Sequence, residues 1–168
     1  MFLVYEGTSK LQMEAYTDSD FQSNVDDRKS TSGYVFTLNE GGVSWSCKQS
    51  TTADSITKAE YIAAAEAAKE AIWMIKFISD LRVFPTIALP VALYCDNNRA
   101  ITQAKEPRSH QNSKHIERRL HKFREYISLG EVSILKVVLT DNIADPTTQL
   151  QLDRHLQKMG IRYMANWL

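Results

Sequence analysis

The chain has 168 residues, which is enough for one domain with a buried core. Its 43% hydrophobic and 24% charged content is that of an ordinary globular domain and argues against disorder. Lys and Arg number 20 and Asp and Glu number 20, so the net charge of zero neither favours nor excludes a nucleic-acid partner.

The first part of the chain predicts an antiparallel arrangement of three strands. Leu11, Met13 and Ala15 alternate with polar residues, which indicates a half-buried strand that ends at Asp18. A polar turn follows. Runs rich in β-branched and aromatic residues at 33–38 and 43–47 then flank Asn39-Glu40-Gly41-Gly42, which has the composition of a hairpin loop.

The rest of the chain alternates helices and strands. Helical periodicity, N-cap residues and the stop signal Gly130 predict helices at residues 57–82, 98–104 and 114–130, and a last helix that begins within 141–149. The continuous apolar run VALYC predicts a strand at residues 91–95, and VSILKVVL predicts another at residues 132–139. Three leading strands followed by this alternation predict an α/β fold with a mixed sheet and helices packed on it.

The two cysteines and the N-terminal segment bear on the compartment. Cys47 and Cys95 lie in strand-like runs outside any metal-ligand spacing, so we expect buried thiols in a reducing compartment. The apolar run in MFLVYEGTSK is too short for a signal peptide, and no run approaches a membrane span in length. We therefore expect a soluble intracellular protein with no membrane partner.

Four acidic residues lie at predicted junctions between elements: Asp18, Glu60, Asp96 and Asp145. Side chains at strand ends and helix starts point off the rim of a sheet, where functional groups gather. Clustered carboxylates need a cation, and oxygen ligands favour Mg²⁺ or Mn²⁺. Two such ions about 4 Å apart would activate water and stabilise the leaving oxygen of a phosphodiester. The pattern predicts phosphodiester hydrolysis.

Each acid also has a structural interpretation. Thr57 and Glu60 fit a capping box, in which Glu60 would only bond a backbone N–H. Asp96 fits the N-cap of the following helix, and Asp145 fits the first turn of the last helix. Asp18 fits a turn at a strand end.

Seven motifs in order carry a family resemblance: YTDSDF, DDRKSTSGYVF, SWSCKQST, AEYIAAAEAAKEAIW, LYCDN, KHI and NIAD. Together they resemble the ribonuclease H domain of copia-type LTR-retrotransposon polyproteins. The resemblance implies the ribonuclease H fold, a mixed five-stranded sheet flanked by helices, at residues 11–150. Residues 1–10 would precede this domain, and residues 151–168 would form a C-terminal extension.

The resemblance also implies an activity, which is metal-dependent cleavage of the RNA strand of RNA–DNA hybrids. Asp18, Glu60, Asp96 and Asp145 match the family's acidic tetrad. It implies that Asp18 bridges two Mg²⁺ or Mn²⁺ ions, that Glu60 and Asp96 hold the ion of the leaving group, and that Asp145 holds the ion of the nucleophile. Asp20 lies outside the tetrad and is expected to form a turn or to act from outside the metal shell.

The implied setting is reverse transcription. Besides the hybrid, the reverse transcriptase domain of the same polyprotein would be a partner, in a cytoplasmic virus-like particle or in the nucleus. Two departures keep a second hypothesis open. Lys58 stands where such domains carry a glutamate, and Thr147-Thr148-Gln149 replaces Leu-Thr-Lys. The alternative is a catalytically silent module that binds nucleic acid or a protein.

A basic stretch runs from Lys105 to Arg124, with seven cations against Glu106 and Glu117. It would contact a hybrid's phosphates, or it is a solvated helix face. The candidate contacts are Lys114, Arg118, Arg119 and Lys122.

Four other side chains receive structural interpretations. His115 and His121 lie six residues apart, on different helix faces, and are read as packing contacts. We expect Trp45 and Trp73 in the core.

Overall fold

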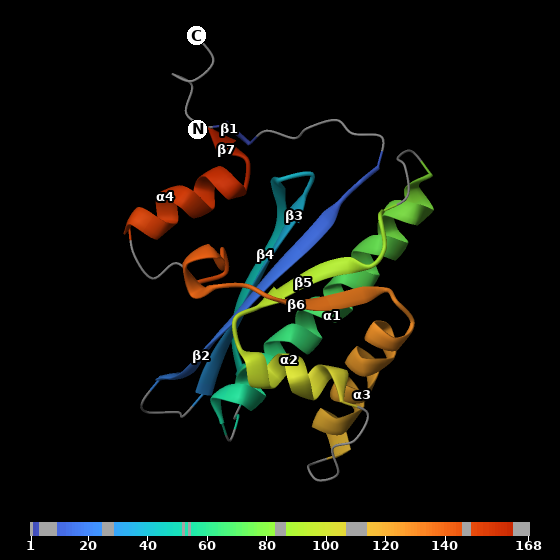
Figure 1. Ribbon diagram of the computed structural model, residues 1–168, viewed down its shortest axis with the longest axis vertical. Coiled ribbons are helices and arrows are strands. Elements are labelled where there is room, and N and C mark those ends of the chain that lie inside the picture. The colour runs from blue at the N-terminus through green and yellow to red at the C-terminus, as the bar shows by residue number, and fades with distance from the viewer. Residues whose placement is uncertain are drawn as a thin grey trace.

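A five-stranded sheet forms the centre of the computed structural model, which describes residues 2–3, 10–24, 29–51, 53, 55–82, 87–106, 114–145 and 149–162. The strand order is β4-β3-β2-β5-β6 (Figure 1). β2 pairs antiparallel with β3 and β3 with β4, whereas β2–β5 and β5–β6 are parallel. The predicted mixed five-stranded sheet is confirmed. Its strands are β2 (Met13–Asn24), β3 (Lys29–Leu38), β4 (Gly41–Thr51), β5 (Val91–Cys95) and β6 (Val132–Lys136).

The central strand β2 is longer than its sequence pattern predicts. Met13, Ala15 and Thr17 alternate as buried residues, as expected of a strand with one face on the core. The strand continues through the polar segment because its backbone pairs with β3 as far as Asp20, opposite Thr31, and again at Asn24, opposite Lys29, with a shift of register between the two. Asp18 therefore lies within the strand and not at its end, so its interpretation as a turn former is wrong.

The hairpin between β3 and β4 is tighter than the predicted four-residue loop. Leu38 pairs with Gly41, so only Asn39 and Glu40 form the turn. Their φ angles are 47° and 64°, the left-handed pair that a two-residue type I′ hairpin turn requires.

Four helices flank the sheet. α1 (Ile56–Leu81), α2 (Asn98–Lys105) and α3 (Lys114–Ser128) lie together on one face, while α4 (Gln149–Lys158) lies on the other side (Figure 1). α1 packs on β2, β3 and β5. Its face toward the sheet is made of alanines, which let the helix approach the buried Phe36 and Leu93 closely. α1, β5 and α2 match the predicted elements within two residues.

The two ends of the described chain meet in a separate two-stranded sheet. β1 (Phe2–Leu3) pairs antiparallel with β7 (Ile161–Arg162). Among the described residues, no helix is both long and apolar enough to span a membrane.

Three apolar expectations differ from the structure. Trp45 and Trp73 are exposed, at 76% and 56%, and Cys47 is exposed, while Cys95 is buried as predicted. Trp45 and Cys47 share the outer face of the edge strand β4. Trp73 stacks on Phe77, with ring centroids 5.2 Å apart, on the solvent side of α1. Tyr61 and the alanines occupy the core side of α1, and Trp73 and Phe77 lie on its outer side.

Candidate active site

Asp18 and Asp96 lie where the paired strands β2 and β5 separate. The last pair in their parallel ladder is Tyr16 and Tyr94, and the Thr17 hydroxyl donates to the Tyr94 carbonyl over 3.2 Å. Two residues beyond this pair on each chain segment stand Asp18 and Asp96. β2 continues along β3 while β5 ends at Cys95, which leaves a site at the carboxyl end of a parallel strand.

Glu60 reaches the same place from α1. Its side chain is buried, at 4% exposure, and the described residues give its Oε2 atom no hydrogen-bond partner. The capping-box interpretation is wrong, because the N-cap of α1 lies two residues before the Thr57 that this motif requires. Ser55 is the N-cap, and its hydroxyl accepts from the Lys58 backbone N–H over 3.3 Å. Glu60 is thus a buried acid with no role in capping.

Asp96 likewise is not the N-cap of the short helix. That position belongs to Asn97, whose Oδ1 accepts from the backbone N–H groups of Arg99 and Ala100 over 3.0 and 3.1 Å. Asp96 is half-buried and is left with no part in the cap. The buried Cys95 thiol lies beside it.

Asp145 is held by a loop and not by the last helix, so its placement in a first helical turn is wrong. Strand β6 stops at Lys136, the 3-10 turn η1 (Leu139–Asp141) follows, and α4 begins only at Gln149. Asp145 is buried, and its backbone N–H donates to the Asn142 carbonyl over 3.2 Å.

Asn142 ties this loop to β2. Its side-chain Nδ2 donates to the Thr17 carbonyl over 2.9 Å, and its Oδ1 accepts from the Ala144 backbone N–H over 3.2 Å. Thr17 directly precedes Asp18, so one side chain links the two segments that carry Asp18 and Asp145. Sequence reasoning missed Asn142, although an asparagine three residues before a candidate ligand is a signal for a loop that bonds its own backbone.

The electrostatics of Glu60 place the other three acids close to it. Burial, with the charges of Asp18, Asp96 and Asp145 as smaller causes, raises the pKa of Glu60 to about 8, although a hydrogen bond from the Ser19 backbone N–H lowers it. A bound cation would relieve the repulsion between Glu60 and the three other carboxylates. The structure thus brings the predicted tetrad together, while the role of each member stays a prediction.

The donor atoms fit a divalent ion. Ligand atoms of Glu60, Cys95 and Asp96 lie within 4.8 Å of one another. Carboxylate oxygens are the ligands that Mg²⁺ and Mn²⁺ prefer, and the unpartnered Glu60 oxygen is available to such an ion. The thiol is a softer donor than this chemistry calls for.

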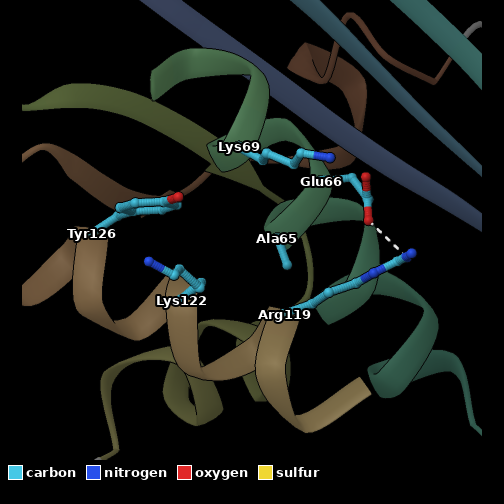
Figure 2. A pocket seen from close by; sticks show the side chains of 6 residues that line it. All are labelled: Ala65, Glu66, Lys69, Arg119, Lys122 and Tyr126. Atoms are coloured by element: carbon cyan, nitrogen blue, oxygen red, sulfur yellow. Dashed lines mark hydrogen bonds and ion pairs between the residues drawn. The ribbon is translucent and has the colours of Figure 1, made fainter. Parts of the chain in front are cut away.

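The predicted nucleic-acid contacts all lie on α3. Arg119 and Lys122 are exposed, and the side chains of Lys114 and Arg118 fall outside the described residues. Arg119 bonds Glu66 of α1 over 2.9 Å, and Lys122 lies 3.6 Å from Glu125. Figure 2 shows the hollow between α1 and α3, about 260 Å³, that these side chains line with Ala65, Lys69 and Tyr126.

The chain is similar in sequence to retrovirus-related Pol polyproteins of plant transposons. The chain is 38% identical over 145 residues to the retrovirus-related Pol polyprotein of a Nicotiana tabacum transposon, which covers 86% of the chain. It is 30% identical over 156 residues to that of an Arabidopsis thaliana transposon, which covers 90%. The chain spans 11% of the length of each of these polyproteins. No family model matches the chain.

Solved structures share the fold. A ribonuclease H1 solved in complex with an RNA/DNA hybrid superposes with a TM-score of 0.58 at 15% identity, covering 86% of this chain and 99% of that one. A foamy viral protease-reverse transcriptase, also in complex with a hybrid, gives 0.54 at 14% identity and covers 85% of this chain and 20% of that one.

Proposed function

Because the homologues of this chain are retrovirus-related Pol polyproteins of copia-type transposons and its fold is the ribonuclease H fold, we propose that it is a ribonuclease H that hydrolyses the RNA strand of RNA–DNA hybrids. The proposed reaction is endonucleolytic and metal-dependent. The proposed setting is reverse transcription, with the reverse transcriptase domain of the same polyprotein as a partner.

One observation carries this proposal, namely the gathering of three aspartates around the buried Glu60. The four acids come from a strand, a helix, a strand end and a loop, at separations in sequence that no local structural role explains. The structural interpretations of Glu60, Asp96 and Asp145 as caps or helix starts do not hold. Four acids that share a site without supporting a helix favour a metal-dependent reaction over a purely structural one.

The residues that would hold the metal are Asp18, Glu60, Asp96 and Asp145. Two Mg²⁺ or Mn²⁺ ions there would supply an activated water and charge stabilisation for the leaving oxygen. The protein's own contribution is rigidity. Asp18 is fixed by the pairing of β2 with β3, Glu60 by the burial of its side chain, and Asp145 by the bond from Asn142 to Thr17. Fixed ligands avoid the reorganisation that mobile ones would need as charge develops.

Binding of the hybrid would use the exposed cations of α3. Arg119 and Lys122 are each paired with a carboxylate at the surface. Exposed pairs of this kind contribute about 0 to 1 kcal/mol, so a phosphate can replace the carboxylate at little cost. The chain is electrically neutral, so a local basic surface would provide its attraction for a polyanion.

A cleavage assay with matched substrates tests the proposal. The chain and its Asp96→Asn variant are each incubated with Mg²⁺ and an end-labelled RNA–DNA hybrid, beside a DNA duplex of the same sequence. We expect the chain to cut only the RNA strand of the hybrid, and the variant to lose this activity. No cleavage by either protein, with hybrid binding retained, would favour the silent nucleic-acid-binding module that Lys58 suggests.

A further inference from the structure

Cys95 brings a sulfur donor into the carboxylate cluster. It is the last residue of β5, it is fully buried, and its side chain faces the same side of the sheet as Val91 and Leu93. That side is covered by α1, the helix that carries Glu60. The thiol donates a long hydrogen bond to the Asn97 carbonyl, at 4.0 Å, and also bonds the Thr17 side chain; a metal ion would be a stronger partner for the sulfur than either of these neutral groups.

Two carboxylates complete a three-donor set around this sulfur. One ligand atom from each of Glu60, Cys95 and Asp96 lies within 4.8 Å of the other two. A tetrahedral ion bonded to sulfur at about 2.3 Å and to oxygen at about 2.0 Å holds its ligand atoms about 3.3 to 3.5 Å apart, so side-chain movements of up to about 1.5 Å would complete the site. Independently of the thiol, the Glu60 Oε2 atom lacks a hydrogen-bond partner among the described residues, although its residue is 96% buried.

We propose that Glu60, Cys95 and Asp96 form a binding site for a thiophilic divalent ion, such as Zn²⁺ or Cd²⁺, that competes with the ions used in hydrolysis. The competition rests on the proposed function, because the soft ion takes two of the four carboxylates. The binding of the soft ion does not depend on the proposed function. On coordination the Cys95 S–H bond is replaced by a sulfur–metal bond, one proton passes to solvent, and no electron is transferred.

The preference for soft ions follows from the donor set. Three protein ligands of mixed sulfur and oxygen, with one position left for water, match the tetrahedral coordination that Zn²⁺ favours. A site made of carboxylates alone has no such preference for a thiophilic metal, because thiolate is the donor that selects it. Cys95 would therefore make this centre more sensitive to Zn²⁺ than an all-carboxylate centre is.

Ultraviolet titration with Cd²⁺ alone tests the site directly. The metal-free chain is titrated in a phosphine reductant that does not bind the ion, and the thiolate-to-Cd²⁺ charge-transfer band is followed. Cys47→Ser is the matched control, because it removes the other cysteine, which is exposed on β4. We expect one Cd²⁺ per chain in the wild type and in Cys47→Ser, no band in Cys95→Ser, and binding at least about tenfold weaker in Asp96→Asn, which keeps the thiol.

Three outcomes would overturn the proposal: a band that persists in Cys95→Ser, a band lost in Cys47→Ser, or Asp96→Asn binding as tightly as the wild type. If Cys95→Ser does not fold, as judged by far-ultraviolet circular dichroism, the Asp96→Asn titration decides the matter. A separate assay adds Zn²⁺ to Mg²⁺-supported cleavage, where half-inhibition of Cys95→Ser should need at least about ten times more Zn²⁺. Absence of cleavage would refute the proposed function and leave the titration result intact.

Discussion

The side-chain amide of Asn142 donates a hydrogen bond to the Thr17 carbonyl over 2.9 Å, and both residues are fully buried. The bond joins the loop of Asp145 to the strand of Asp18. These acids are 127 positions apart in sequence, and this contact fixes one relative to the other.

Removing this bond should loosen the metal site as well as the fold. We expect Asn142→Ala to lower the free energy of unfolding by about 1 to 3 kcal/mol, because a buried polar group loses its partner. It should also reduce the rise in melting temperature that Mg²⁺ produces, since Asp145 is no longer held in place. Calorimetry with and without Mg²⁺ measures both effects. Gln157→Ala, on the exposed side of α4, is the control and should change neither.

The cap of α1 separates the two interpretations of Glu60. Ser55→Ala should cost about 1 kcal/mol of stability, because Ser55 satisfies the Lys58 N–H, and Thr57→Ala should cost less. Chemical denaturation of the two variants gives the comparison. If Thr57→Ala proves the more damaging of the two, the capping box at Thr57 and Glu60 is restored.

Glu60 should make the metal-free protein less stable as pH rises. Its pKa is raised from 4.5 to about 8, so between these values the folded state binds more protons than the unfolded state, and the free energy of unfolding falls with pH. The slope contributed by one such group is at most about 1.4 kcal/mol per pH unit. Denaturation in a chelator at pH 5 and pH 8 measures it, and Mg²⁺ should recover stability most at pH 8. A slope in Glu60→Gln equal to that of the wild type would contradict this assignment.

The cations of α3 should determine the salt dependence of hybrid binding. The double variant Arg118→Ala/Lys122→Ala should bind a hybrid more weakly and reduce the slope of log affinity against log salt by about 1 to 2, because fewer counterions are released. Fluorescence anisotropy at several salt concentrations provides the slopes. Lys76→Ala removes an exposed charge about 24 Å along α1 from Glu60 and serves as the control. An unchanged slope in the double variant would exclude α3 from the interface.

The sequence identifies the periodic elements well and their ends less well. The apolar run VALYC ends at the position where β5 ends, although only Val91, Leu93 and Cys95 on one face are fully buried and the other face is half-buried. β2 extends beyond the alternating apolar residues that predict it, because backbone pairing with β3 does not require apolar side chains. Asp145 lies before α4 and not in its first turn, because the segment around Asn142 satisfies its backbone in a turn of its own.

The four acids could be selected from the sequence, but their arrangement could not. Their positions at predicted junctions identify them as candidates, while the bond from Asn142 to Thr17 joins segments that no local pattern connects. The exposure of Trp73 was equally beyond local reasoning, because α1 carries apolar residues on both faces and only the tertiary packing decides which face is buried.

The central claim is that Asp18 belongs to the metal centre and its neighbour Asp20 does not. The most direct test is the single-turnover rate of RNA-strand cleavage in Mg²⁺ for the wild type, Asp18→Asn and Asp20→Asn, two variants of the same strand with the same charge change. We predict that Asp18→Asn loses at least about 100-fold in rate, as expected when charge stabilisation at the reacting centre is removed, and that Asp20→Asn stays close to the wild type. Equal rates for the wild type and Asp18→Asn, or no cleavage by any of the three, would contradict the account.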